Sequence, residues 1–339
     1  MIDKFKDIED IVKYVPKNSN IIRNVVKAYT IINSEKYNKA LCSISGGSDS
    51  DVMLDIIYKC DKFNKVDYVW FNTGVEYKAT KDHLKYLEDK YGIKIIRERA
   101  IKSIPQCCKE YGQPVISKGV SQFIHRLQIH NFQWEDEPLE VLNAKYPKCH
   151  SALKWWTNTN DSIMFNVDYH RYLKEFMILN PPTFKISDSC CTWAKKKVVK
   201  NLIKSGKYDL NIMGVRKAEG GSRAFAYDSC FDDNNTGLDN YRPLFWFTDK
   251  DKMEYEKHCN IVHSDCYTKY GFKRTGCCCC PFAGRKLQEE LALTKGWEPN
   301  LYNAAIHIFK DSYAYMEAYH EFRDKQTLLE KKKKYRKLI

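Results

Sequence analysis

The sequence predicts an α/β fold in which helices flank a parallel, twisted sheet. An apolar run at residues 40–44 leads through a loop of small residues into a helical pattern that begins near Val52. A second apolar run, rich in β-forming residues, covers 66–71, and a shorter one covers 93–96. Strand, helix and strand at this spacing form a βαβ unit, in which the strands are parallel and the crossover is right-handed.

Helical patterns lie on both sides of this unit. Residues 2–35 predict helices that pack against the sheet, and their first apolar stripe consists of Ile8, Ile11, Val12 and Val15. Scattered tryptophans and other aromatic residues at about 131–180 predict a helical insertion, and residues 286–319 predict further helices. We therefore expect a helical segment at 1–36, an α/β domain at 37–250 that contains the insertion, and a C-terminal region at 251–339 with a cysteine-rich loop and a basic tail.

The composition is that of an ordinary globular protein with a basic balance. The chain has 339 residues, of which 43% are hydrophobic and 29% are charged, and its net charge is +13. This balance indicates a polyanionic partner such as nucleic acid, or an anionic nucleotide, although a lysine-rich solvated surface explains it equally well. No secretory signal or membrane-spanning apolar run is evident, so we expect a cytoplasmic protein without a membrane partner. The 14 cysteines then indicate metal or redox chemistry rather than disulfides.

The loop after the first predicted strand has the composition of a phosphate-binding site. Gly46 and Gly47 let the backbone approach an anion closely, and the hydroxyl side chains around them add donors. The first N–H groups of the following helix point into the same space, at the positive end of the helix dipole. No lysine follows Gly47, so this is not the GxxxxGK[ST] loop. A simple glycine–serine turn is the alternative interpretation.

The motif Ser-Gly-Gly-x-Asp-Ser at 45–50 resembles the PP-loop of the N-type ATP pyrophosphatases. That superfamily includes the phosphoadenosine phosphosulfate (PAPS) reductase-like proteins, tRNA-thiolating enzymes and DNA phosphorothioation enzymes. The resemblance extends through ordered motifs over roughly residues 37–310. It implies an adenine nucleotide α-hydrolase-like fold.

Two further loops at predicted strand ends are similar to segments of the same family. Residues 72–76 match its Asp-Thr-Gly-x-Glu segment, with Asn72 in place of the aspartate. Residues 214–223 are similar to its Gly-x-Arg-x-x-Glu-Ser-x-Arg segment, with Gly220-Gly221 changing the spacing. Ligands of such sheets bind beyond the carboxyl ends of the strands. The resemblance implies that the nucleotide is bound by Ser43, Ser45, Gly46, Gly47, Ser48, Asp49, Ser50, Asn72, Thr73, Gly74, Gly214, Arg216 and Arg223.

Two cysteine-rich segments supply four candidate metal ligands. Cys190 and Cys191 are adjacent, and Cys277 and Cys280 are the ends of a run of four cysteines. Four thiolates suit a [4Fe–4S] cluster or a structural zinc ion. The pattern resembles the Cys-Cys…Cys-x-x-Cys motif of adenylylsulfate reductases and of phosphorothioation-type relatives. This resemblance implies a [4Fe–4S] cluster, with zinc as the alternative.

Other adjacent thiols have no assigned role. Cys278 and Cys279 fill the variable positions of the motif, so the choice of ligands inside 277–280 is open. Cys107 and Cys108 form a further adjacent pair. Redox or persulfide chemistry and simple burial are both open for them.

The resemblance implies an enzyme of the PP-loop ATP pyrophosphatase and sulfurtransferase type. In that reaction the loop and Mg²⁺ hold the β- and γ-phosphates, attack at the α-phosphate releases pyrophosphate, and the adenylylated acceptor is then open to a sulfur nucleophile. Arg216 and Asp49 are the expected catalytic residues. The expected partners are ATP or an adenylylsulfate-type nucleotide, DNA or tRNA as the acceptor, and a cysteine desulfurase or another sulfur donor.

Two other functions stay open. One is the reduction of adenylylsulfate, or of its 3′-phosphate, to sulfite. The family's reductases carry a catalytic cysteine near the C-terminus, whereas the last cysteine here is Cys280, which argues against this function. The other is a non-catalytic nucleotide- or nucleic-acid-binding module in a defence or mobile-element system, for which Asn72 and the altered spacing at Gly220-Gly221 leave room.

Overall fold

The structure is a computed structural model that describes residues 2–220, 226–233 and 238–336. Its chain forms two compact units. The sheet unit comprises Met1–Ile101 and Ala194–Cys278, and the helical unit comprises Lys102–Trp193 and Cys279–Ile339. This grouping differs from the predicted ranges, because part of 251–339 belongs with the sheet and a long segment inside 37–250 does not. As boundaries of independently folding domains, the ranges 1–36, 37–250 and 251–339 stay a prediction.

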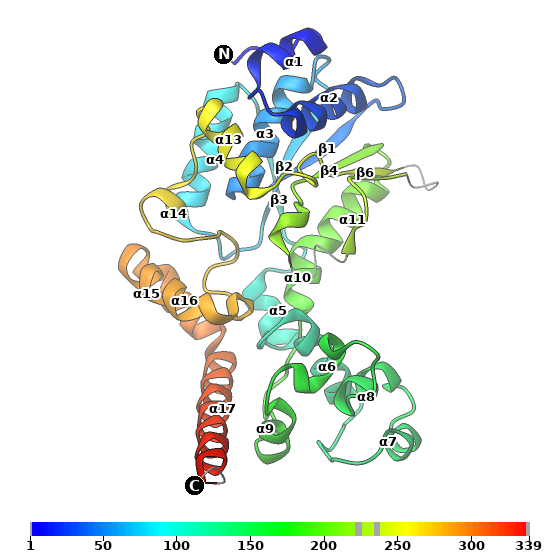
Figure 1. Cartoon of the computed structure of the whole chain (residues 1–339), viewed down its shortest axis with the longest axis vertical. Coiled ribbons are helices and arrows are strands. Elements are labelled where there is room, and N and C mark those ends of the chain that lie inside the picture. Colours follow the sequence, from blue (N-terminus) through cyan, green and yellow to red (C-terminus); the bar gives the residue numbers. More distant parts are fainter. Residues whose placement is uncertain (1, 221–225, 234–237, 337–339) are drawn as a thin grey trace. The chain divides into compact units, whose positions relative to one another are not determined.

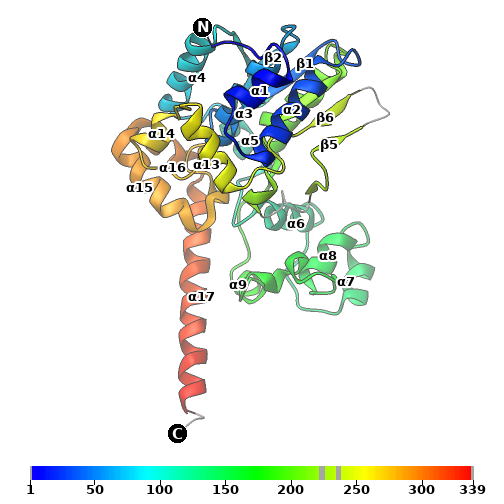
Figure 2. The same cartoon turned by 45° about the horizontal axis from the view of Figure 1, so that its top comes forward.

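The sheet unit contains a six-stranded sheet in the order β3-β2-β1-β4-β6-β5 (Figure 1). The strands are β1 (Ala40–Ile44), β2 (Val66–Asn72), β3 (Ile95–Arg99), β4 (Leu210–Met213), β5 (Phe231–Asp232) and β6 (Asp239–Tyr241). All neighbouring strands are parallel except β5 and β6, which form an antiparallel pair at one edge (Figure 2). The predicted α/β fold with a mostly parallel sheet is confirmed.

Strand β1 lies at the point where the strand order reverses. The chain runs from β1 to β2 and β3 on one side and later returns as β4 on the other side. Cys42 pairs with Tyr68 of β2 and with Ile212 of β4, so β1 is central and parallel to both neighbours. Ligands of open α/β sheets bind beyond the carboxyl ends of the strands at such a reversal. The loop after β1 is therefore where the fold itself favours a ligand site.

Helices cover both faces of this sheet (Figure 1). Alternate residues of β1 point to opposite faces, so Cys42 and Ile44 join the larger core with the N-terminal helices, while Leu41 joins a smaller core with Leu202 and Ile203. The helices of this unit are α1 (Ile8–Tyr14), α2 (Ser19–Asn33), α3 (Ser48–Cys60), α4 (Lys78–Tyr91), α11 (Lys197–Lys204), α13 (Asp249–His258) and α14 (Asp265–Thr268), with a short 3₁₀ turn η4 (Lys217–Glu219).

The N-terminal helices pack on the sheet domain, as expected, but the predicted stripe of α1 is only half correct. Ile11 and Val15 are buried, whereas Ile8 is 48% and Val12 is 51% exposed. Helix α1 has only 7 residues and packs against α2, and Ile11 is its one buried residue. The second predicted stripe lies on α2: Ile21, Val25 and Ile32 are buried, whereas Ile22, Val26 and Tyr29 are only partly buried against the same core.

The helical unit has no strand of its own among its described residues. Its elements are α5 (Ile104–Tyr111), α6 (Lys118–Ile129), α7 (Leu139–Lys145), α8 (His150–Trp156), η1 (Ile163–Phe165), η2 (Val167–Tyr169), α9 (Leu173–Leu179), α10 (Ser189–Cys191), η3 (Thr192–Lys196), η5 (Pro281–Lys286), α15 (Leu287–Trp297), α16 (Pro299–Ile308) and α17 (Lys310–Arg336). Residues 131–180 are thus helices and turns. None of the described helices is both long and apolar enough to cross a membrane.

Candidate active site

The loop between β1 and α3 is packed tightly on both of its sides. Gly46 has φ +71°, and a Cβ atom there would lie 2.9 Å from Cγ2 of Thr80. At Gly47 a Cβ atom would lie 3.1 Å from Oγ1 of Thr275 and 3.3 Å from the hydroxyl of Tyr267. Glycine is therefore required at the two positions for different reasons. Position 46 needs a left-handed backbone and a close approach, and position 47 needs space.

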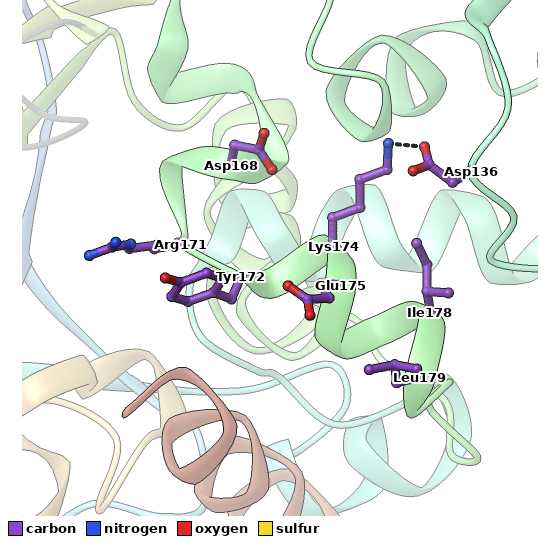
Figure 3. A pocket seen from close by; sticks show the side chains of 8 residues that line it. All are labelled: Asp136, Asp168, Arg171, Tyr172, Lys174, Glu175, Ile178 and Leu179. Carbon is purple, nitrogen blue, oxygen red and sulfur yellow. Dashed lines mark hydrogen bonds and ion pairs between the residues drawn. The ribbon is translucent and has the colours of Figure 1, made fainter. Parts of the chain in front are cut away.

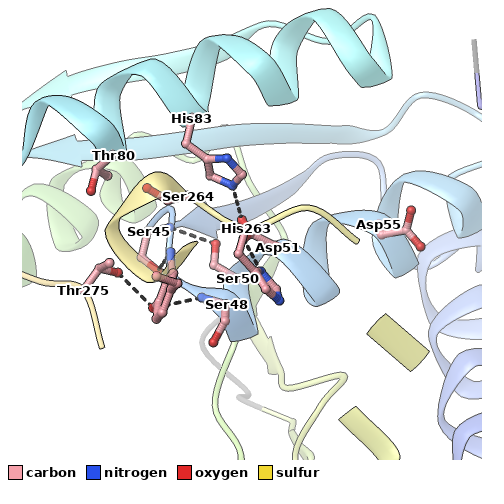
Figure 4. Close-up of polar contacts among 12 residues, drawn as sticks. Ser45, Ser48, Ser50, Asp51, Asp55, Thr80, His83, His263, Ser264 and Thr275 are labelled. Carbon is pink, nitrogen blue, oxygen red and sulfur yellow. Dashed lines mark hydrogen bonds and ion pairs between the residues drawn. The ribbon is translucent and has the colours of Figure 1, made fainter. Parts of the chain in front are cut away.

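Hydroxyl groups occupy the acceptor positions around this loop (Figure 4). The amide of Ser45 donates to Oγ of Ser50 at 2.9 Å, and the amide of Gly47 donates to Oγ of Ser45 at 3.3 Å. The amide of Ser48, the first residue of α3, donates to the Tyr267 hydroxyl at 3.1 Å. That hydroxyl also lies 3.2 Å from Oγ1 of Thr275. The N-cap Gly47 has no side chain to cap α3, so the hydroxyl of Tyr267, from a distant segment, acts in its place.

Charged side chains converge on Asp49 in the first turn of α3. Arg216, just after β4, contacts Oδ1 of Asp49 through Nε at 2.9 Å and Asp249 through Nη1 at 2.8 Å. Lys252 of α13 contacts the same Oδ1 at 3.1 Å and Glu256 at 3.3 Å, and it donates to Oγ of Ser48 at 2.7 Å. Two cations and three carboxylates thus meet beside the loop.

Arg216 is held in place as a charged group. It is only 6% exposed, and burial by itself lowers the pKa of its guanidinium, but the hydrogen bond to Asp249 and the charge of Asp49 outweigh this and raise the pKa above the usual value. Gly214, two residues earlier, faces α3: a Cβ atom there would lie 3.4 Å from Sδ of Met53. The segment after β4 therefore lies directly against the helix that follows the loop.

A buried relay of polar groups lies behind the first turn of α3 (Figure 4). Asp51 is 1% exposed, and it contacts Nε2 of His83 at 2.9 Å and Nδ1 of His263 at 2.8 Å. Nε2 of His263 continues to Glu256 at 3.0 Å. Burial opposes charge on His263, but the hydrogen bonds with Asp51 and Glu256 outweigh it and raise its pKa to about 9. The imidazolium therefore persists at neutral pH and joins α3 to α13 electrostatically.

The second predicted loop, after β2, is closed by Glu76. Its carboxylate accepts hydrogen bonds from the amide of Thr73 at 2.7 Å and from the amide of Gly74 at 3.0 Å. Asn72 Oδ1 also accepts from the amide of Gly74, at 3.0 Å, so Asn72 stabilises the turn. Oγ1 of Thr73 lies 3.7 Å from Sγ of Cys277. The loop therefore lies next to one predicted metal ligand.

The helical unit brings several thiols together around Cys190. Helix α10, which carries Cys190 and Cys191, packs against α5, which carries Cys107 and Cys108. The pKa of the Cys190 thiol is raised far above its usual range, first by a hydrogen bond with Cys191, then by burial, and further by the charges of Cys191, Cys108 and Cys280. Thiols in this arrangement are costly to ionise together unless a cation is bound.

The four consecutive cysteines have unlike environments. Cys278 and Cys279 are fully buried, whereas Cys277 and Cys280 are partly exposed. The amide of Cys278 donates to the carbonyl of Val75 at 2.9 Å within the sheet unit. Sγ of Cys279 lies 3.3 Å from Oγ1 of Thr294 on α15, within the helical unit. The two inner cysteines have packing roles in separate units.

The predicted site residues fall into three groups. Residues 45–50, Gly214 and Arg216 surround one loop in the sheet unit, and 72–74 lie beside Cys277 in the same unit. Cys190, Cys191 and Cys280 belong to the helical unit, so the four predicted ligands are not in one unit. Among the residues that the structure describes, no group of three or more histidine, cysteine, aspartate or glutamate side chains is arranged to hold a metal ion. The metal assignment stays a prediction, and Arg223 lies outside the described residues.

Sequence reasoning missed the groups that reach the loop from far along the chain. These are Lys252, Tyr267, Thr275, His83 and His263. Only Lys252 had a local signal, because the Thr248–Asp251 capping box marks a helix start and puts Lys252 in its first turns. Thr275 lies two residues before the run of four cysteines, but nothing in that motif points to the loop, and the other three lie in segments without a motif.

The helical unit also has a cavity of about 560 Å³ (Figure 3). Its lining mixes both signs of charge, and a salt bridge joins Lys174 to Asp136. Tyr172 at its wall has a left-handed backbone, with φ +62°. Nothing in this lining selects one class of ligand.

Comparison with known proteins supports the resemblance over a stretch that runs from β1 of the sheet unit to α6 of the helical unit. The family model of the phosphoadenosine phosphosulfate reductase domain matches residues 39–128. This stretch includes β1, the loop at 45–50, β2 and the loop at 72–76. No curated protein matches the chain.

Several solved structures are similar at low identity. The phosphoadenylyl-sulfate reductase of Candida auris is 12% identical, with 81% of this chain and 96% of that chain covered and a TM-score of 0.40. The U34-tRNA thiolase NcsA of Methanococcus maripaludis, solved with its [4Fe–4S] cluster, is 12% identical, with 90% and 79% covered and a TM-score of 0.37. The NH3-dependent NAD synthetase of Campylobacter jejuni is 11% identical, with 92% and 96% covered and a TM-score of 0.38. Likenesses this remote carry no argument about activity.

The family match covers two of the motifs that carry the resemblance, and it does not reach residues 214–223 or the cysteine motif. It includes the Ser-Gly-Gly-x-Asp-Ser loop and the Asn-Thr-Gly-Val-Glu loop, both at the carboxyl ends of parallel strands. The resemblance of this chain to the PAPS reductase-like proteins is thereby confirmed over residues 39–128.

Proposed function

We propose that the sheet unit binds ATP through the loop at 45–50 and uses it to adenylylate an acceptor, with release of pyrophosphate, as the first step of sulfur transfer. The observation that supports this most is the meeting of the glycine loop, Asp49 and Arg216 at the reversal of strand order. A nucleotide-binding loop, a metal-binding carboxylate and a buried cation are the components that phosphoryl chemistry requires.

The loop has suitable donors for phosphate oxygens. The amides of Gly47 and Ser48 now donate to the hydroxyls of Ser45 and Tyr267, and phosphate oxygens would take over these hydrogen bonds. Mg²⁺ prefers carboxylate and phosphate oxygens, and Asp49, within the 45–50 segment, is the carboxylate that would hold it. Its side chain is 18% exposed and thus accessible to a metal-bound nucleotide.

The chemistry then follows from charge. A nucleophilic oxygen of the acceptor attacks the α-phosphorus, the bond from this phosphorus to the bridging oxygen breaks, and pyrophosphate leaves with the electron pair. Negative charge that develops on the α-phosphate oxygens is stabilised by the fixed guanidinium of Arg216. A sulfur nucleophile then displaces AMP from the acceptor, so the sulfur takes the place of the acceptor oxygen.

We further propose that Cys190, Cys191, Cys277 and Cys280 hold a [4Fe–4S] cluster, with zinc as the alternative metal. Three of these thiols belong to the helical unit, and the raised pKa of Cys190 fits a donor set that a metal would neutralise. The Cys-x-x-Cys spacing of the resemblance favours the outer pair of the run as ligands. When bound, the cluster supplies iron sites held by thiolates. The reduced thiols that it requires suit the cytoplasm.

A nucleic acid, DNA or tRNA, is the acceptor that the charge favours. Helix α17 ends in a basic run whose residues Lys331, Lys332 and Lys333 are exposed, and the chain as a whole carries +13. A cysteine desulfurase or another sulfur donor would supply the sulfur.

The test is to incubate anaerobically purified holoprotein separately with ATP and with adenylylsulfate. Pyrophosphate release from ATP that increases with added tRNA or DNA is the expected result. Sulfite formation from adenylylsulfate without pyrophosphate release would instead support the reductase. Tight, salt-sensitive nucleic-acid binding without any turnover would support the non-catalytic module.

The metal is tested on the same preparation. Iron and acid-labile sulfide in near-stoichiometric amounts are expected, and zinc in their place would refute the cluster.

A further inference from the structure

We propose that Lys252 is the cation that binds the pyrophosphate end of the nucleotide, in the role that the lysine of a GxxxxGK[ST] loop has in other proteins. This inference rests on the proposed function, in that it takes the loop at 45–50 as a phosphate site. It adds a residue from a segment about 200 positions away from that loop.

The position of Lys252 is fixed by a well-anchored helix start. Thr248 caps α13, and its hydroxyl and amide both bond to Asp251. Asp251 in turn accepts hydrogen bonds from Asn18 at 2.9 Å and from Asn20 at 2.8 Å, both at the start of α2. The first turn of α13 is therefore joined to the core helices of the sheet unit, and the backbone of Lys252 has little freedom to move.

The ammonium group lies at the loop itself. Its side chain is 14% exposed, and Nζ donates to Oγ of Ser48 at 2.7 Å. Ser48 follows Gly47 directly. In a GxxxxGK[ST] loop the residue that follows the second glycine is the lysine, so Ser48 occupies the lysine position. The charge that is missing from the loop sequence is thus supplied by α13.

The surrounding charges allow Lys252 to exchange one partner for another. It is now shared between Asp49 and Glu256. With Mg²⁺ and phosphate bound, Asp49 would have the metal and Arg216, which now lies 2.9 Å away, as its partners. Glu256 keeps His263, whose Nε2 lies 3.0 Å away. Neither carboxylate is left buried and unpaired, so Lys252 can turn to a phosphate oxygen at low cost.

This arrangement makes a selective prediction about ligands. Lys252 lies at Ser48, on the loop that holds the β- and γ-phosphates, whereas Arg216 serves the α-phosphate. Lys252 should therefore favour ATP and pyrophosphate over AMP, because only the first two have phosphates at this end of the site.

The test is isothermal titration of ATP, pyrophosphate and AMP, each with Mg²⁺, into the full-length protein and two variants. Lys252→Met is expected to weaken ATP and pyrophosphate binding about tenfold or more, as expected for the loss of a hydrogen bond between charged groups. AMP binding should change less than about twofold. Lys252→Arg, which keeps the charge, should restore most of the lost affinity. Lys250→Met is the matched control, because Lys250 is exposed in the first turn of the same helix.

The outcomes separate this proposal from the proposed function. If wild-type protein binds ATP and Lys252→Met binds it equally well while its melting temperature is unchanged, the role of Lys252 is wrong and the nucleotide site stands. An equal loss for ATP and AMP would also overturn it, because that pattern indicates a general distortion of the site. If wild-type protein binds neither ATP nor pyrophosphate, both proposals fail.

Discussion

The phosphate loop of the sheet unit and the thiol group of the helical unit differ in how their charges are balanced. Around Asp49, each charged side chain has an opposite partner within hydrogen-bonding distance, such as Arg216 at 2.9 Å. Around Cys190, the neighbouring side chains that raise its pKa are themselves thiols. The first site is balanced by pairs of opposite charge, whereas the second is a group of thiols whose ionisation a bound cation would favour. Substitutions should therefore weaken the two sites in different ways.

The largest effect is expected from Cys190→Ser. Because Cys190 is the most buried of the predicted ligands, its loss should remove nearly all bound iron and sulfide from anaerobically purified protein. Metal analysis and the visible absorption spectrum measure this. Cys149→Ser is the control. Cys149 is a buried thiol of the same unit, and its pKa is raised by burial and not by neighbouring thiols. Iron content that is equal in both variants would contradict the assignment of Cys190 as a ligand.

The next effect concerns turnover. Arg216→Gln removes the buried charge that we assign to the α-phosphate, and pyrophosphate release should fall about 10²–10³-fold, as for the loss of one transition-state donor. ATP binding should fall much less. Lys217→Gln, at the next and exposed position, serves as the control. A loss that appears only in KM would assign Arg216 to ground-state binding instead.

A smaller effect concerns the shape of the loop. Gly46→Ala combines a left-handed φ of +71° with a contact of 2.9 Å to Thr80, so it should destabilise the protein by about 1–3 kcal/mol and weaken nucleotide binding. Gly92→Ala is a matched control with φ +60° and open space around the new methyl group. It should cost about 1–2 kcal/mol from backbone strain alone and leave binding intact. Urea unfolding and ATP titration of both variants measure the difference, and equal binding by the two would refute the tight-loop account.

The smallest effect concerns pH. The pKa of His263 is raised from 6.5 to about 9, because hydrogen bonds with Asp51 and Glu256 outweigh burial. His83 shares Asp51, Lys252 shares Glu256, and the Tyr267 ring packs beside the imidazole. A raised pKa means that the folded state binds the proton more tightly, so the stabilisation is complete below about pH 6.5 and is lost as the pH rises through about 9.

Chemical unfolding of wild type and His263→Gln between pH 6 and pH 10 checks this sign. The wild type should be the more stable protein at the acidic end, and the gap should close toward the alkaline end. A gap that widens with pH would show that His263 is neutral in the folded protein.

The sequence predicted the parts of the fold that depend on local pattern. The strands at 40–44 and 66–71 were found nearly at their true bounds, because apolar runs that feed glycine-rich loops are local signals. The strand predicted at 93–96 begins at Ile95 instead, and the antiparallel β5–β6 pair was not predicted, because both strands are short and lack apolar alternation. The exposure of Ile8 and Val12 was also missed, since periodicity alone does not say how wide the contact of a helix is.

The candidate site was predictable only in its loop. Ser45–Ser50 and Arg216 carry motifs, but Lys252, Tyr267 and Thr275 reach the loop through tertiary packing. The relay from Asp51 to His83 and His263 joins segments that are 32 and 212 positions apart. No spacing rule connects such segments, so only coordinates reveal them. The thiol group around Cys190 could not be predicted from spacing either, because the raised pKa of Cys190 depends on which thiols surround it in the fold.

The most direct test of the central proposal is to determine which phosphate bond of ATP breaks. Holoprotein, a nucleic-acid acceptor and a sulfur donor would be incubated with ATP labelled at the α- or at the γ-phosphorus, and the products would be separated. The proposal predicts that the γ-label appears in pyrophosphate and that the α-label appears in the adenylylated acceptor and then in AMP. Release of the γ-label as inorganic phosphate, with the α-label in ADP, would contradict it.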